Sequence, residues 1–229
     1  MIDLTKIDTT IYVSGFAIHQ PVTVFTDYLI AIVSFCFSFL LNTSAFKDEI
    51  TINWKRFFLL LSIASFLGGC SHGFFAIHDG AGYKLFWLPM QALNIIAVYC
   101  AQQATLFSTL KNPDKKNFWK WSYKIQLLIF FVAVFIFQNF IVVVIDTTIG
   151  MLPIMIIHFL EAKKTNSSAW VAYGILVLCF AAVVNATKFS FHVYFNYLDI
   201  SHILIIIQLS FMFIGINQKA KSTIVFSKV

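Results

Sequence analysis

A carboxylate and an imidazole lie three residues apart in the segment YFNYLDISHILIIIQLSF, residues 194–211, where the chain enters a long apolar run. The carboxylate belongs to Asp199 and the imidazole to His202. Residues at positions i and i+3 of a helix project from the same face. A helix start needs only one small polar cap, whereas an ionisable group at membrane depth usually marks a functional site. The pair therefore indicates a site at the edge of an apolar helix.

A second imidazole comes from His72, which follows the small residues Gly68 and Gly69 in another apolar run. Two imidazoles and one carboxylate form the ligand set of a catalytic zinc site, where three protein ligands leave a fourth position for water. Zinc lowers the pKa of that water to about 7, so that hydroxide can attack an amide or ester carbonyl. The sequence thus predicts His72, Asp199 and His202 as ligands of one zinc ion.

Three more polar side chains lie in or beside apolar runs and are candidates for the reaction itself. Asp27 or Asp146 would accept the proton of the attacking water, and Ser71 would orient that water or stabilise an oxyanion. Two carboxylates also have structural explanations. Asp199 is a favoured residue for a helix N-cap, and Asp27 would be a first-turn acid that the helix dipole favours. Both explanations stay open from the sequence.

The composition identifies the elements that must position these groups. The chain has 229 residues, of which 59% are hydrophobic and 11% charged, with a mean hydropathy of +0.83. Soluble domains are about half apolar and a quarter charged, and a domain of this size cannot bury so much apolar surface. We therefore predict an integral membrane protein whose partner is membrane lipid. Basic residues are not interleaved with aromatic ones in a polar context, so no nucleic-acid partner is predicted.

A helix needs about 20 mainly apolar residues to cross a bilayer. Long apolar runs of this kind exclude a β-barrel, whose strands alternate with a short period. The sequence predicts an all-α bundle of seven transmembrane helices in a single domain, residues 1–229. The predicted spans are about 22–42, 56–78, 84–108, 117–137, 139–161, 169–189 and 199–217.

The distribution of basic residues predicts the orientation of the bundle. With seven spans, thirteen of the sixteen lysines and arginines fall on the side of the first, third and fifth connections and the C-terminal tail. The other three, Lys6, Lys84 and Lys188, fall on the opposite side. By the positive-inside rule the N-terminus is outside and the C-terminus inside. The polar residues of six helices then lie in the outer half, which predicts a cavity open to the outside.

In two short segments the chain resembles the CREST superfamily of alkaline ceramidases and PAQR-like (adiponectin-receptor-like) seven-helix proteins. "GCSH" with "GFF" corresponds to the second-helix histidine of that family, at His72, and "SHILIIIQLSF" to a last-helix histidine, at His202. The family's serine four residues before the first histidine is Gly68 here, and Asp199 stands near the other last-helix histidine position. The resemblance implies a zinc-dependent hydrolase of ceramide-like lipid amides, and a divergent member in a bacterial inner membrane.

Three functions are compatible with these features. The first is a zinc-dependent intramembrane hydrolase that cleaves a lipid amide or ester from the outer leaflet. The second is a seven-helix sensor whose polar cavity binds a small ligand without cleaving it. The third is a proton or ion carrier that uses Asp27, Asp146 and the histidines as a relay. The apolar inner half has few polar groups that could continue such a relay. The sequence specifies neither the substrate nor the oligomeric state.

Overall fold

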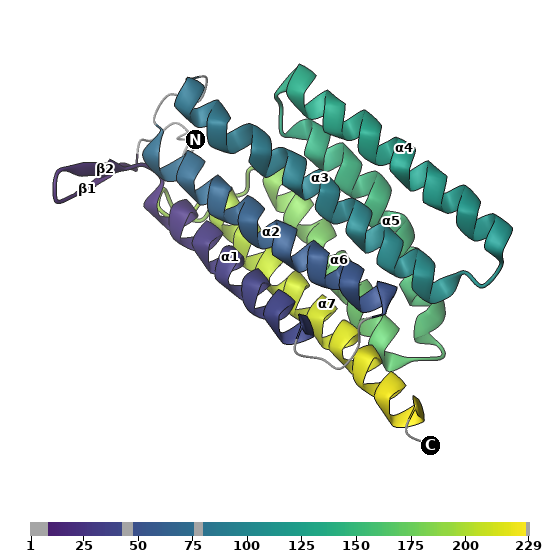
Figure 1. The fold of residues 1–229 in the computed structure, drawn as a ribbon. Coiled ribbons are helices and arrows are strands. Elements are labelled where there is room, and N and C mark those ends of the chain that lie inside the picture. The colour runs from purple at the N-terminus through teal and green to yellow at the C-terminus, as the bar shows by residue number, and fades with distance from the viewer. Residues whose placement is uncertain (1–8, 43–47, 76–79, 228–229) are drawn as a thin grey trace.

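The computed structural model describes residues 9–42, 48–75 and 80–227 (Figure 1). The described residues form a short β-hairpin and seven helices, each long and apolar enough to cross a membrane. The predicted all-α seven-helix architecture is confirmed, and by length and composition the chain is a multi-pass membrane protein. The elements in chain order are β1 (Ile11–Val13), β2 (Phe16–Ile18), α1 (Pro21–Asn42), α2 (Glu49–Phe74), α3 (Ala81–Thr109), α4 (Pro113–Phe137), α5 (Ile141–Ala162), α6 (Asn166–Thr187) and α7 (Tyr197–Ser227).

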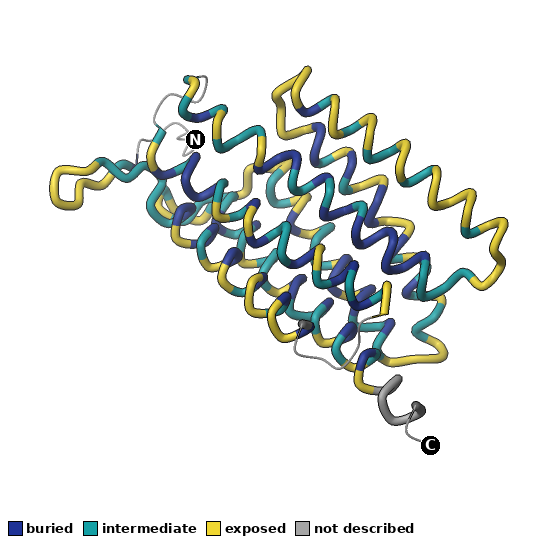
Figure 2. The backbone as a smooth tube through the Cα atoms, in the orientation of Figure 1, coloured by how far each residue is buried: buried dark blue, intermediate teal, exposed yellow. Residues whose placement is uncertain are grey.

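Six of the helices in the described part of the chain form a ring in the order α1, α2, α3, α5, α6, α7, and α7 closes the ring by contacting α1. The remaining helix, α4, packs outside the ring against α3 and α5 (Figure 1). Most of α4 is exposed (Figure 2), and Val134 is its buried residue. The last helix is therefore a neighbour of the first, so residues near the two ends of the chain can share a site.

Two helices, α2 and α4, begin a full turn or more earlier than the apolar runs predict, because polar residues cap them. The carboxylate of Asp48 accepts a hydrogen bond from the Thr51 N–H at 2.8 Å, and α2 starts at Glu49. The amide oxygen of Asn112 accepts from two backbone N–H groups at the start of α4, where Pro113 occupies the first turn. Side-chain oxygens at the N-cap satisfy backbone donors that the helix itself leaves unpaired. A hydropathy scan does not detect these first turns, since charged residues interrupt the apolar run there.

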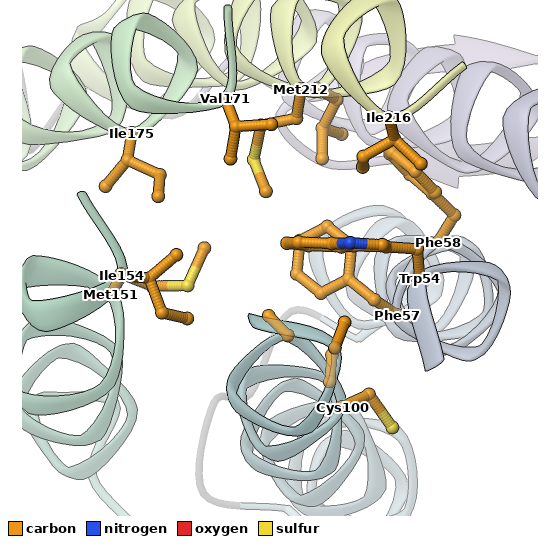
Figure 3. Packing of buried hydrophobic residues seen from close by; sticks show 14 of the residues in the cluster. Trp54, Phe57, Phe58, Cys100, Met151, Ile154, Val171, Ile175, Met212 and Ile216 are labelled. Carbon is orange, nitrogen blue, oxygen red and sulfur yellow. The ribbon is translucent and has the colours of Figure 1, made fainter. Parts of the chain in front are cut away.

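The apolar core lies inside the ring, toward the end where α1 finishes and α2 begins. Its buried residues come from all six ring helices, and Figure 3 shows side chains from α2, α3, α5, α6 and α7 meeting around Trp54, Phe57 and Phe58. The ring of Phe37 stacks on that of Phe213 at 4.3 Å, which ties α1 to α7. This half of the bundle is closed by hydrocarbon packing.

Glycines bring α1 and α2 close together in the other half. A Cβ atom added at Gly69 would lie 2.6 Å from the ring of Tyr28, and one at Gly73 would lie 2.9 Å from Val24. Small residues at a helix interface allow close approach of the two backbones in a membrane protein. The adjacent Gly68 faces the carboxylate of Asp27. The glycines of α2 thus position the acidic residue of α1.

The hairpin that precedes α1 is the only β-sheet in the described residues. Its strands are joined by Ser14 and Gly15, which both have positive φ angles (51° and 87°). That conformation is typical of the two-residue turns that match the twist of a hairpin. The hairpin extends from the end of the bundle where α1 begins (Figure 1).

Candidate functional site

Asp199 connects the start of α7 to α1. The Thr23 hydroxyl donates to Asp199 Oδ1 at 2.7 Å, and the Asn196 N–H donates to Asp199 Oδ2 at 2.8 Å. In return, the amide oxygen of Asn196 accepts from the Leu198 N–H at 2.8 Å. This reciprocal arrangement is a capping box. Asp199 therefore does cap α7, but from the third helical position, while Asn196 takes the position of the N-cap.

Because Asp199 is completely buried and both of its oxygens are bonded, we expect Asp199→Ala to destabilise the protein by about 1–3 kcal/mol. The variant leaves the Thr23 hydroxyl and the Asn196 N–H without their acceptor. Thermal unfolding of the purified protein in detergent measures the effect. Asp114→Ala is the matched control, since Asp114 is also a first-turn acid but is exposed. Equal melting temperatures for the two variants would contradict the anchoring role.

His202 lies one turn deeper on α7, and its ring is oriented by Thr26 of α1. The distance between Thr26 Oγ1 and His202 Nδ1 is 2.9 Å. The Thr26 hydroxyl donates its own hydrogen to the Thr23 carbonyl oxygen at 3.0 Å. A hydroxyl has one hydrogen to donate, so while Thr26 donates to the Thr23 carbonyl, its Oγ1 can only accept from a hydrogen on His202 Nδ1. The other ring nitrogen, Nε2, is then available to a further partner.

That nitrogen faces Asp27. The distance between His202 Nε2 and Asp27 Oδ1 is 3.6 Å. The second oxygen of the carboxylate, Oδ2, is buried and has no hydrogen-bond partner among the described residues. The residue is only 5% exposed, and Gly68 of α2 covers it: a Cβ atom there would lie 3.4 Å from Oδ1 and 3.5 Å from Oδ2. The first-turn explanation for Asp27 is wrong, because α1 begins at Pro21 and has no acidic residue in its first turn.

Ser71 and His72 reach the same region from α2. They follow Gly68 by three and four positions, so they lie on the face of α2 that covers Asp27. His72 packs edge-to-face on Trp87, with ring centroids 5.9 Å apart. The Ser71 hydroxyl is fully buried and makes no hydrogen bond within the described part of the chain. Asp27, Asp199 and His202 are thus brought together between α1 and α7, and His72 lies on the face of α2 that covers Asp27.

Asp146 belongs to a different network. Gln126 of α4 donates to Asp146 Oδ1 at 2.7 Å and to its backbone carbonyl at 3.3 Å. The amide oxygen of Gln126 accepts from Gln102 of α3 at 2.9 Å. Asp146 is therefore bonded between α3, α4 and α5, and the structure does not bring it together with Asp27 and His202.

We expect Gln126→Leu to loosen the attachment of α4, because Gln126 supplies the side-chain bonds from α4 to α3 and α5 in the described residues. Interhelical hydrogen bonds in membranes average about 0.6 kcal/mol, with a maximum near 1.7, so a loss of about 1–2 kcal/mol is expected. Hydrogen exchange in α4, followed by mass spectrometry, should accelerate. Ser122→Ala is the control, since its hydroxyl bonds only within α4. Unchanged exchange in Gln126→Leu would show that apolar contacts alone hold α4.

Two cavities of the described structure lie away from the Asp27–His202 contact. One cavity of about 290 Å³ lies at the start of α3 and the α4–α5 turn and includes Trp87. Another, of about 40 Å³, lies at the opposite end of the bundle and includes His158 and Lys219. The polar groups at this end of the bundle are packed together, and the open space is beside them. Among the described residues, no three His, Cys, Asp or Glu side chains are already placed to hold a metal ion.

The sequence did not predict some residues of this region, and some of the residues that it singled out lie elsewhere. Thr23 and Thr26 were not predicted, although their spacing from Asp27 in "TVFTD" puts Thr23 and Asp27 on one helical face. His192 is exposed in the α6–α7 connection. His78 and Asp79, near the outer end of the second predicted span, lie outside the described residues.

A family model described as "Family of unknown function (DUF6962)" matches residues 22–221. The chain belongs to this family. No curated protein and no solved structure matches the chain. The range matched by DUF6962 begins in the first turn of α1 and ends within α7. It therefore contains the whole ring of helices and all the residues that meet around Asp27 and His202.

Proposed function

We propose that this DUF6962 protein is a zinc-dependent hydrolase that cleaves a lipid amide or ester at the membrane. The observation that carries the proposal is the contact between His202 Nε2 and Asp27 Oδ1 at 3.6 Å. With the hydrogen of His202 on Nδ1, where Thr26 Oγ1 can accept it, Nε2 would present a lone pair to the Asp27 carboxyl group. Lone pairs on both sides of a buried contact are costly unless a proton or a metal cation lies between the two groups.

The spacing of the two groups fits a metal ion. Two ligands of one tetrahedral zinc ion, each about 2.0–2.2 Å from the metal, are about 3.3–3.6 Å apart. A metal-binding histidine usually donates its other ring N–H to an oxygen, which fixes the ring orientation. The hydrogen bond from His202 Nδ1 to Thr26 supplies that support. Zinc bound here would supply a water of lowered pKa for attack on a carbonyl.

The proposed ligands are Asp27, His72 and His202. Asp27 takes the ligand position that the sequence assigned to Asp199, since both Asp199 oxygens already serve Thr23 and Asn196. The three proposed ligands are not yet assembled, so His72 would have to move from Trp87 toward the pair. Asp199 keeps a positioning role, because it holds α7 against α1.

The remaining groups of the region have roles in the same proposal. Asp27 Oδ2, which has no hydrogen-bond partner among the described residues, would accept the proton of the attacking water. The Ser71 hydroxyl is also buried without a partner in the described structure, and it would donate a hydrogen bond to the developing oxyanion. Asp146 is left out of the reaction because Gln126 engages it elsewhere.

The distribution of charge supports an orientation with this region outside. The described lysines and arginine concentrate at the other end of the bundle, near the starts of α2, α4 and α6 and the end of α7. Lys84 and Lys188 are the described exceptions. By the positive-inside rule, α1 would begin outside and α7 would end inside. The substrate would then enter from the outer leaflet, in a bacterial inner membrane.

The two alternative functions differ in how well the structure supports them. A carrier needs polar stations across the whole bilayer, and the aromatic core around Trp54, Phe57 and Phe58 closes the other half of the ring. A sensor needs only the polar region itself. It is therefore the alternative that the experiment must separate from the hydrolase.

The test combines metal analysis with a search for lipid products. Purified full-length protein should contain about one zinc per chain. Incubation with lipid amides and esters should release fatty acid, detected by mass spectrometry. A chelator should stop the release and added zinc should restore it. Zinc-free protein that leaves every lipid intact would overturn the hydrolase. Zinc without any release would favour a metal-binding sensor.

A further inference from the structure

The cavity of about 290 Å³ has a wall of three aromatic rings. Tyr83 and Trp87 of α3 stack with centroids 5.1 Å apart, and Phe140 at the start of α5 lies 5.8 Å from Trp87. Lys84, Gln138 and Asn139 complete most of the remaining lining. The cavity therefore combines aromatic surface, amide groups and one lysine at the end of the bundle where α3 begins.

Hydrogen bonds to buried groups hold the aromatic wall in place. The Trp87 indole N–H donates to the Gln91 amide oxygen at 2.6 Å, and the Gln91 amide nitrogen donates to the Asn139 carbonyl at 3.1 Å, in the amide orientation that satisfies both bonds. Gln91 is fully buried, and Tyr83 is 7% exposed. Interfacial tryptophans and tyrosines usually direct their polar ends to the membrane surface. Trp87 instead donates its N–H to Gln91 inside the protein. The wall is therefore fixed by the protein and is not part of an aromatic belt at the membrane surface.

The charge of the cavity selects its ligand. Among the described residues that line it, Lys84 carries the only charge, and no described acid lines it. Lysine binds phosphate as a point charge, and the side-chain amides of Gln138 and Asn139 can donate further hydrogen bonds. A ligand that suits a cation, amides and an aromatic wall together has an anionic group joined to an apolar part.

The cavity is also adjacent to the proposed metal site. Trp87 lines the cavity with its ring and receives the edge-to-face contact of His72. A molecule on the wall is therefore one aromatic ring away from the histidine that must move to complete the ligand set.

We propose that this cavity binds the phosphodiester head group of an anionic membrane lipid. Lys84 contacts the phosphate, and the Tyr83–Trp87 wall packs against the glycerol region. The inference rests on the proposed function in one respect, since it names the substrate class of that hydrolase. Binding itself requires neither zinc nor turnover, so the two proposals can fail separately.

The test uses the full chain reconstituted in nanodiscs of phosphatidylcholine mixed with phosphatidylglycerol. Native mass spectrometry measures which lipids stay bound. Wild-type protein should retain phosphatidylglycerol preferentially, and Lys84→Gln should weaken that retention about tenfold, as expected for one charged hydrogen bond. Lys84→Arg should preserve the preference. Lys188→Gln is the matched control, because it removes the other described lysine at this end of the bundle but lies outside the cavity lining.

The outcomes separate the subsite from the metal site. Zinc content should be the same in Lys84→Gln and wild type, and phosphatidylglycerol retention should survive in His202→Ala. Equal retention of both lipids by the wild-type protein would overturn the proposal. So would equal losses in Lys84→Gln and Lys188→Gln, since a general surface charge would then be responsible. Displacement of phosphatidylglycerol by inorganic phosphate at equal concentration would overturn the assignment to a lipid.

Discussion

Asp27→Asn is expected to abolish zinc binding and to reduce lipid hydrolysis at least about a hundredfold, in the range of a lost general base. The change removes the negative charge that faces His202 Nε2 at 3.6 Å. It keeps the size of a side chain that packs against Gly68. Zinc per chain, measured by elemental mass spectrometry on purified protein, and fatty-acid release give the two readouts.

The matched variant is Asp199→Asn. Its amide oxygen can still accept from Thr23 or from the Asn196 N–H, so zinc should be retained while the melting temperature falls. A second pair repeats the comparison for histidine. His202→Ala should lose zinc, whereas His192→Ala, an exposed histidine in the α6–α7 connection, should keep it. Loss of zinc in Asp199→Asn with retention in Asp27→Asn would return the ligand position to Asp199.

The ring order of the helices explains which parts of the site the sequence could predict. Hydropathy shows each apolar run directly, so the seven spans follow from composition. The i, i+3 spacing places Asp199 and His202 on one face of a helix whatever surrounds it. Asp27 and Asp146 look alike in sequence, because each is a single acid beside an apolar run. Only the packing of α1 against α7 and of α4 against α5 separates their surroundings.

The roles of Thr23 and Thr26 depend on contacts between α1 and α7. A sequence does not show which residues of two distant helices face each other. Threonine is common in membrane helices, where its hydroxyl often bonds to its own backbone, and Thr26 does so with the Thr23 carbonyl. Its second role, orienting His202, arises across α1 and α7. The same limit applies to the open space. The polar residues predicted a cavity among themselves, but the open space lies beside the rings of Tyr83, Trp87 and Phe140.

Gly215→Val is expected to destabilise the protein by about 3 kcal/mol, the upper part of the range for overpacked sites. A Cβ atom at Gly215 would collide with the Ser167 backbone carbonyl, and would lie 2.9 Å from Val171 and 3.1 Å from the Trp170 Cβ. Neither the carbonyl nor a Cβ can rotate away, so α6 and α7 must separate. Thermal unfolding in detergent measures the loss.

Gly174 of α6 packs just as closely against α7. Its added Cβ would lie 2.8 Å from the Gln208 carbonyl oxygen and 2.7 Å from Met212, so Gly174→Val should be comparably destabilising. Ser210→Ala is the control, since that hydroxyl bonds within α7 itself. Because α7 carries both Asp199 and His202, separating it from α6 should also reduce zinc binding. A Gly215→Val protein that melts like the wild type would contradict the close α6–α7 contact, and with it the rigid support that the proposed metal site requires.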